Sequence, residues 1–77
     1  MRKYYLEFIL SAQDILESKI KNSLMEFGDN LKIFQPLQDI EGKKDNLRIE
    51  IETQDPTLIF DICSQFGKIK SVKVNEI

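Results

Sequence analysis

The sequence predicts an α+β fold: a two-layer sandwich in which a four-stranded antiparallel sheet carries two helices on one face. Two observations lead to it. Segments that alternate with period two and segments with helical periodicity follow one another in the order βαββαβ. Asp55–Val74 contains a helix start, a helix, a helix stop and a strand. The part of the chain before it can be read as a variation of this helix–strand unit. Two right-handed βα units joined by a hairpin give the strand order 4-1-3-2. Residues 1–77 are expected to form a single domain.

The first strand is predicted over Tyr4–Leu10, where aromatic and branched side chains alternate and the even positions face the core. A helix is predicted over Ala12–Phe27, with Ser11 as its N-cap, Asp14 close to a capping box, and Gly28 as a left-handed stop. Its apolar stripe consists of Ala12, Leu16, Ile20, Leu24 and Phe27.

The middle of the chain predicts an antiparallel hairpin. Its first strand begins in Asp29–Ile40, and Pro36 makes it an edge strand or one with a bulge, because proline cannot donate to a ladder. Residues 41–46 form the turn, and Leu47–Thr53 forms the second strand. The side chains expected to face inward are Leu31, Ile33, Leu47, Ile49 and Ile51.

The second helix has the clearest boundaries. Asp55 is its predicted N-cap, Pro56 occupies the first helical position and Gly67 ends it. Its buried stripe consists of Ile59, Ile62, Cys63 and Phe66. A last strand follows over Ile69–Val74. Its inward residues are expected to be Val72 and Val74.

The composition indicates a solvated globular surface. The net charge is −2 and 31% of the residues are charged, so there is no basic excess to bind phosphates. Cys63 is the only cysteine, which rules out an internal disulfide and favours a reducing, cytoplasmic location. The N-terminal apolar run contains Glu7 and ends at Leu10, too short for a membrane span or an export signal. We therefore expect no membrane association and no nucleic-acid partner.

The residue types point to no catalytic, cofactor or metal site. One thiol and no histidine cannot hold an iron–sulfur cluster or a structural zinc ion. Cys63 lies on a core stripe without a histidine to activate it, so we interpret it as a structural thiol. Glu50 and Glu52 share one strand face and could form a carboxylate pair, but a solvated strand face is the simpler interpretation.

The predicted topology resembles the ferredoxin-like superfold, without a match to a specific family. Residues 66–74, Phe-Gly-Lys-Ile-Lys-Ser-Val-Lys-Val, resemble the end of the first helix and the second strand of an RNA recognition motif. That resemblance implies base stacking on aromatic side chains of strands one and three. Tyr5 fits this role, whereas strand three offers none. Its outward residues are Arg48, Glu50 and Glu52, while the lysines of the motif are Lys68, Lys70 and Lys73.

The strand order also resembles that of ACT domains, which implies binding of amino acids or similar small effectors. Those domains commonly carry a glycine after the first strand, where this chain has Ser11 or Ala12. A small-molecule effector therefore remains an alternative that rests on topology.

The sequence favours a non-enzymatic module that acts by protein–protein contact, as a homodimer or with a protein partner. Exposed apolar side chains that gather in one place mark an interface. The candidate interface residues are Tyr5, Ile9, Phe34 and Phe60. The three functions that we weigh are thus a protein-interaction module, an ACT-like effector domain and an RNA-binding domain.

Overall fold

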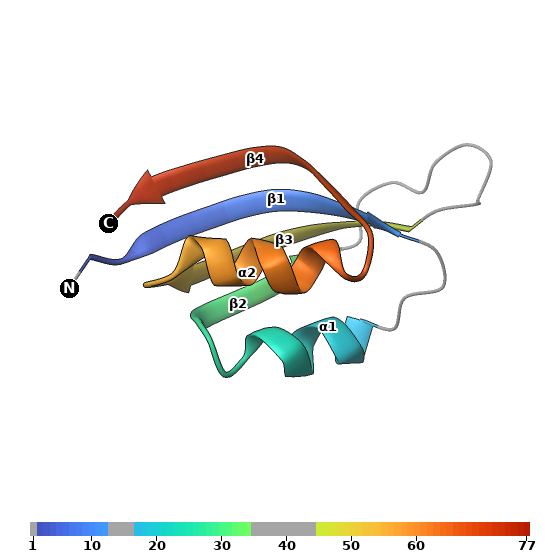
Figure 1. Cartoon of the computed structure of the whole chain (residues 1–77), viewed down its shortest axis with the longest axis horizontal. Coiled ribbons are helices and arrows are strands. Elements are labelled where there is room, and N and C mark those ends of the chain that lie inside the picture. The colour runs from blue at the N-terminus through green and yellow to red at the C-terminus, as the bar shows by residue number, and fades with distance from the viewer. Residues whose placement is uncertain (1, 13–16, 35–44) are drawn as a thin grey trace.

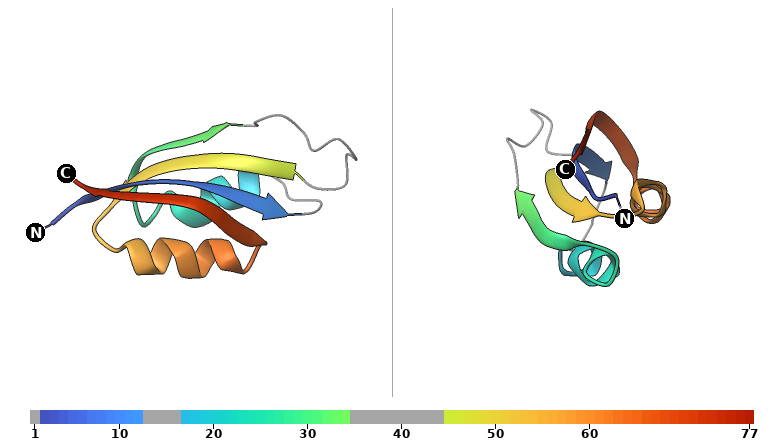
Figure 2. Two further views of the ribbon diagram at one scale, coloured as in Figure 1. Left: turned by 90° about the horizontal axis from the view of Figure 1, so that it is seen from above. Right: turned by 90° about the vertical axis from the view of Figure 1, so that its left-hand side faces the viewer.

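The computed structural model describes residues 2–12, 17–34 and 45–77 and shows four strands and two helices in the order βαββαβ (Figure 1). The elements are β1 (Tyr4–Ala12), α1 (Glu17–Leu24), β2 (Asp29–Phe34), β3 (Asp45–Thr53), α2 (Pro56–Ser64) and β4 (Lys68–Glu76). The antiparallel sheet has the order β2-β3-β1-β4, and both helices lie on one side of it (Figure 2). The predicted α+β, ferredoxin-like sandwich with strand order 4-1-3-2 is confirmed.

The core lies between the helices and the two central strands. Burial alternates along β1, so that Leu6, Phe8 and Leu10 face the helices and the intervening residues face away. Their cross-strand partners on β3 are Ile51, Ile49 and Leu47. From the helices, the fully buried side chains are Ile20, Leu24, Ile59 and Cys63. The predicted inward residues of β1, β3 and α2 therefore form one apolar layer.

The first helix is shorter than the sequence pattern predicted. Ser11 was expected as its N-cap, but Ser11 belongs to β1, where it lies opposite Asn46 and Lys68. Ladder pairing on both sides outweighs the capping preference of a serine. At the other end, α1 stops at Leu24, and Phe27 is exposed on the following turn, so its place in the buried stripe was wrong.

Some predictions fall on residues outside the described ranges. They are the capping role of Asp14, the place of Leu16 in the apolar stripe, the effect of Pro36 on its strand, and the first four residues of the turn predicted over 41–46. The last two residues of that turn, Asp45 and Asn46, belong to β3, where they pair with Ala12 and Ser11, so this part of the prediction was wrong. Within the described residues, β2 is an edge strand as expected, with Leu31 and Ile33 packed against the core.

The predicted start of α2 is confirmed. Oδ1 of Asp55 accepts a hydrogen bond of 3.2 Å from the Leu58 backbone N–H, and Pro56 is the first helical residue. Beyond the helix, Gly67 passes so close to β1 that a Cβ atom there would collide with the Ser11 carbonyl oxygen and the Ala12 side chain. A glycine is needed at this position for close packing.

Strand β4 contains a β-bulge that changes which of its side chains face each side of the sheet. Glu7 pairs with Lys73 but Ile9 pairs with Lys70, so one extra residue lies between these pairs. At this bulge Ser71, with a φ of 56°, lies in the left-handed region. As a result both lysines face the open side of the sheet, although they are three positions apart.

Candidate functional site

The open face of the sheet is organised in rows that cross the four strands. The central row runs Lys32, Glu50, Glu7, Lys73, and the next row runs Phe34, Arg48, Ile9, Lys70. Each strand thus contributes one side chain to each row. In the central row, two acidic residues lie side by side between two lysines, so the charges of this row sum to zero.

Arg48 links the acidic residues of the central row. Its Nη2 atom lies 2.7 Å from Oε2 of Glu50 and 3.2 Å from Oε1 of Glu7. Lys73 approaches the same Glu7 carboxylate at 3.7 Å. The Arg48 guanidinium also lies 5.5 Å from the centre of the Phe34 ring, in the range of a cation–π contact. The carboxylates of this face are therefore already paired within the chain.

Tyr5 completes this network. Its hydroxyl donates a hydrogen bond of 2.6 Å to Oε1 of Glu50. This bond to a carboxylate, with burial second, raises the pKa of Tyr5 from 10.0 to about 12. The same bond, together with Arg48, lowers the pKa of Glu50. Glu52 instead accepts a hydrogen bond from the side-chain amide of Asn30. Glu50 and Glu52, the carboxylate pair considered from the sequence, therefore each have a different partner.

The structure places three of the four candidate interface residues together. Tyr5, Ile9 and Phe34 all lie on the open face, but Tyr5 and Ile9 are only half-exposed, among charges. The fourth, Phe60, was expected to be an exposed apolar side chain. It packs edge-on against Phe8, with ring centres 5.4 Å apart, so that expectation was wrong. Phe60 lies on the helix side of the sheet.

Two exposed valines lie on the same side as Phe60. Val72 and Val74 were expected to be buried, but they are 47% and 46% exposed. Val74 lies opposite the buried Leu6, and the register shift leaves Ser71 and Val72 opposite Phe8. Both valines therefore face the helix layer at the edge of the sheet, beyond the area that α2 covers. We call the exposed Val72 and Val74, together with the partly buried Phe60, the α2–β4 surface.

A signal for this surface was present in the sequence. Ile69 and Val72 are both apolar but three residues apart, and period two cannot place both on one face without a bulge. The spacing of Lys68, Lys70 and Lys73 shows the same irregularity, since it changes from two residues to three. In the structure all three lysines lie on the open face, opposite Ser11, Ile9 and Glu7.

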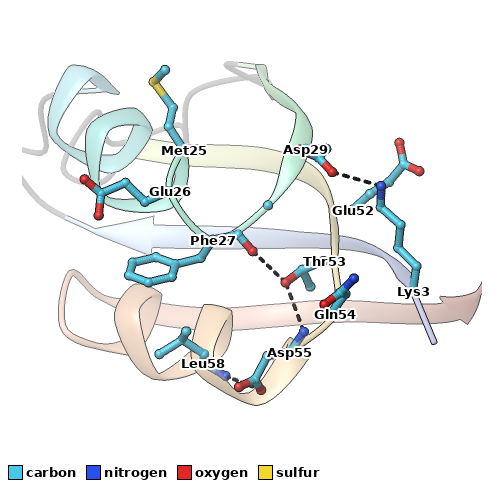
Figure 3. A pocket seen from close by; sticks show the side chains of 11 residues that line it. Lys3, Met25, Glu26, Phe27, Asp29, Glu52, Thr53, Gln54, Asp55 and Leu58 are labelled. Carbon is cyan, nitrogen blue, oxygen red and sulfur yellow. Dashed lines mark hydrogen bonds and ion pairs between the residues drawn. The ribbon is translucent and has the colours of Figure 1, made fainter. Parts of the chain in front are cut away.

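An open pocket of about 350 Å³ lies at the end of the sheet where β1 begins (Figure 3). The ion pair between Lys3 and Asp29, at 2.9 Å, lies on one wall, and this contact raises the pKa of Lys3. Thr53 donates to the Phe27 carbonyl at 2.8 Å and accepts from the Asp55 N–H at 3.1 Å. The Thr53 hydroxyl therefore joins the turn that follows α1 to the residue that precedes α2.

Cys63 is fully buried and its pKa is raised to about 12 by burial, as expected of a structural thiol. Within residues 2–12, 17–34 and 45–77, no three potential metal ligands of the histidine, cysteine, aspartate or glutamate type come together. Among the described residues, neither helix has the length and apolar character needed to cross a membrane.

Comparison with known proteins adds no further constraint. No protein family, no curated protein and no solved structure matches this chain. A functional proposal therefore depends on the surfaces described above.

Proposed function

We propose that the protein is a small non-enzymatic module that works by binding another protein chain through the α2–β4 surface. The observation that carries this proposal is the position of Val72 and Val74. Both are nearly half-exposed on a strand whose outer edge has no partner among the described strands. A free strand edge beside exposed apolar side chains is a site where another chain can add.

The open face supports this role less well, although three candidate residues lie there. An interface over it would bury Glu7, Glu50 and Arg48, which are already paired with one another. Removing such charges from water costs more than their existing contacts return. Phe34 is exposed on this face but packs against the same guanidinium. The apolar α2–β4 surface carries no such penalty.

Chain length also favours association. A chain of this size buries only ~60% of its unfolded surface, so its stability is marginal. Any chain that binds the folded state stabilises it. We also propose a cytoplasmic location, on the grounds of the single buried cysteine.

Light scattering at several concentrations, together with affinity pull-downs, tests the proposal. Replacing both Val72 and Val74 with serine should abolish the interaction without unfolding the protein, since both side chains are already partly hydrated. Phe34→Ser is the matched control, because Phe34 is exposed to the same degree, 45%, on the opposite face. A protein that stays monomeric and captures no partner would remove the basis of the proposal.

A second candidate is a small-effector domain of ACT type, favoured by the pocket of about 350 Å³ in Figure 3. Its volume is at the lower end of the range for small-molecule sites, roughly 300–1,000 Å³. A thermal-shift screen with amino acids and nucleotides tests it. The absence of any stabilising compound would argue strongly against this function.

RNA binding finds less support on the open face. Lys68, Lys70 and Lys73 do line the β4 side of it, and Tyr5 is two residues from Glu7, the cross-strand partner of Lys73. The neighbouring strands carry Glu7, Glu50 and Glu52, which repel phosphate groups. Amide-shift titration with short single-stranded RNA at two salt concentrations tests this alternative.

A further inference from the structure

The outer edge of β4 has backbone groups that point away from the sheet at alternate residues. The Ile77 N–H donates to the Lys3 carbonyl of the neighbouring chain segment at 2.8 Å. In an antiparallel pair, residues two positions apart turn their backbone groups the same way. Asn75 and Lys73 therefore face β1 as well. The residues that alternate with them, Val72, Val74 and Glu76, turn their N–H and C=O groups outward.

The bulge at Ser71 limits this edge to the segment Val72–Glu76. Before the bulge the alternation has the opposite phase, so a straight partner strand cannot match both parts. A partner must therefore place its own outward groups opposite these three residues.

A second copy of the chain meets this condition in one register. With Val74 on a two-fold axis, Val74 lies opposite Val74 of the second copy, and Val72 lies opposite Glu76 of the second copy. On the open face Lys73 then lies opposite Asn75 of the second copy. A register centred on Lys73 would instead set two lysines directly opposite each other, which is destabilising.

We propose that the partner of the α2–β4 surface is a second copy of this chain, added to β4 by antiparallel pairing of Val72–Glu76 with Val74 at the two-fold axis. This inference rests on the proposed function and names its partner. The two Val74 side chains then meet on the helix side, and the two sheets become continuous. The charged open face stays in water, because Lys73 keeps its contact with Glu7.

The size of the contact sets its strength. Pairing limited to Val72–Glu76 falls below a standard interface of ~1,200–2,000 Å². We therefore expect an equilibrium between monomer and dimer that shifts with concentration.

Cysteine cross-linking tests the register. In Val74→Cys the two introduced residues have Cα atoms about 5.5 Å apart, within the range of a disulfide. In the control Asn75→Cys they are about 8 Å apart on the opposite face, beyond that range. Cys63 is fully buried, so the introduced thiol is the accessible one. We expect mild oxidation to link Val74→Cys into dimers and to leave Asn75→Cys monomeric. Equal cross-linking of the two variants would overturn the register.

Val74→Pro tests the strand pairing itself. The Val74 N–H points away from β1, so proline removes no bond of the sheet and is tolerated on such an edge. It does remove one hydrogen bond from each copy, and the dimer Kd should rise by about tenfold. Val74→Thr keeps the N–H and is the control. Circular dichroism checks that each variant is folded.

The outcomes separate this inference from the proposed function. A monomer at all concentrations that still captures a different protein through Val72 and Val74 would overturn the self-pairing and leave the interaction role standing. A dimer that is insensitive to Val74→Pro would also overturn it. If the wild-type protein neither self-associates nor captures a partner, both proposals are overturned.

Discussion

Tyr5 reaches diagonally across the sheet to Glu50, with 2.6 Å between its hydroxyl oxygen and the carboxylate, although its direct cross-strand partner is Glu52. The diagonal contact places a neutral hydroxyl against an ionised carboxylate. It favours the protonated form of Tyr5 and the ionised form of Glu50, so both groups resist titration in the folded state.

The Tyr5–Glu50 contact predicts opposite pH limits for these two groups. The pKa of Glu50 is lowered by folding, so its stabilisation is present above its ordinary pKa of 4.5 and is lost as pH falls through the folded value. The pKa of Tyr5 is raised, so its stabilisation is present below pH 10 and is lost as pH rises through about 12.

Tyr5→Phe should therefore remove the tyrosinate absorbance change near pH 12. Urea unfolding should show a difference from wild type that is largest at neutral pH and shrinks below about pH 4.5. Tyr4→Phe, on the other face of β1, is the control. A Tyr5→Phe difference that does not change with pH would contradict this account.

Arg48→Gln should destabilise the sheet because Glu7 and Glu50 are direct cross-strand partners. Arg48 contacts both carboxylates, and without it two like charges face each other. Urea unfolding should give a lower midpoint at low salt and a smaller difference at high salt, since salt screens the repulsion. Adding Glu7→Gln should restore part of the loss. No recovery in this double variant would show that charge repulsion is not the cause.

Asp55→Ala tests the start of α2. The variant removes the acceptor for the Leu58 N–H, and losing such an N-cap costs about 1 kcal/mol of unfolding free energy. Asp55→Asn keeps an acceptor oxygen and should lose much less. Urea denaturation of the two variants checks the difference. Equal losses would indicate that the negative charge, rather than the hydrogen bond, stabilises this helix.

Cys63 should be unreactive in the folded protein. The thiolate is the reactive form, and burial raises the pKa of this thiol to about 12. We expect a thiol reagent to modify Cys63 only after unfolding in urea, at a rate that follows the unfolded fraction. Rapid modification in native buffer would contradict the buried position.

The fold could be predicted from the sequence because its signals are local. Asp55 with Pro56 marks a helix start, and alternation marks the faces of β1 and β3, all of which the structure confirms. The start of α1 could not be predicted in this way. Ser11 has the local character of a cap, and only pairing with β3 and β4, which are distant in sequence, extends β1 through it.

The candidate surfaces were harder to predict because exposure depends on how far a helix reaches. Alternation places Val72 and Val74 on the helix side correctly. It cannot show that α2 leaves the outer edge of the sheet uncovered. In the same way, Phe60 lies off the central stripe of its helix, and only the position of Phe8 beneath it reveals the contact.

Ser71 is a spare residue in the alternation of its strand. Because the bulge absorbs it, deleting Ser71 would leave every lysine and valine of β4 on its present face. The deletion would, however, straighten the strand and expose an unbroken edge along its whole length. A longer uniform edge accepts partners in several registers, and chains could then join end to end. One serine thus decides whether this edge has a defined end.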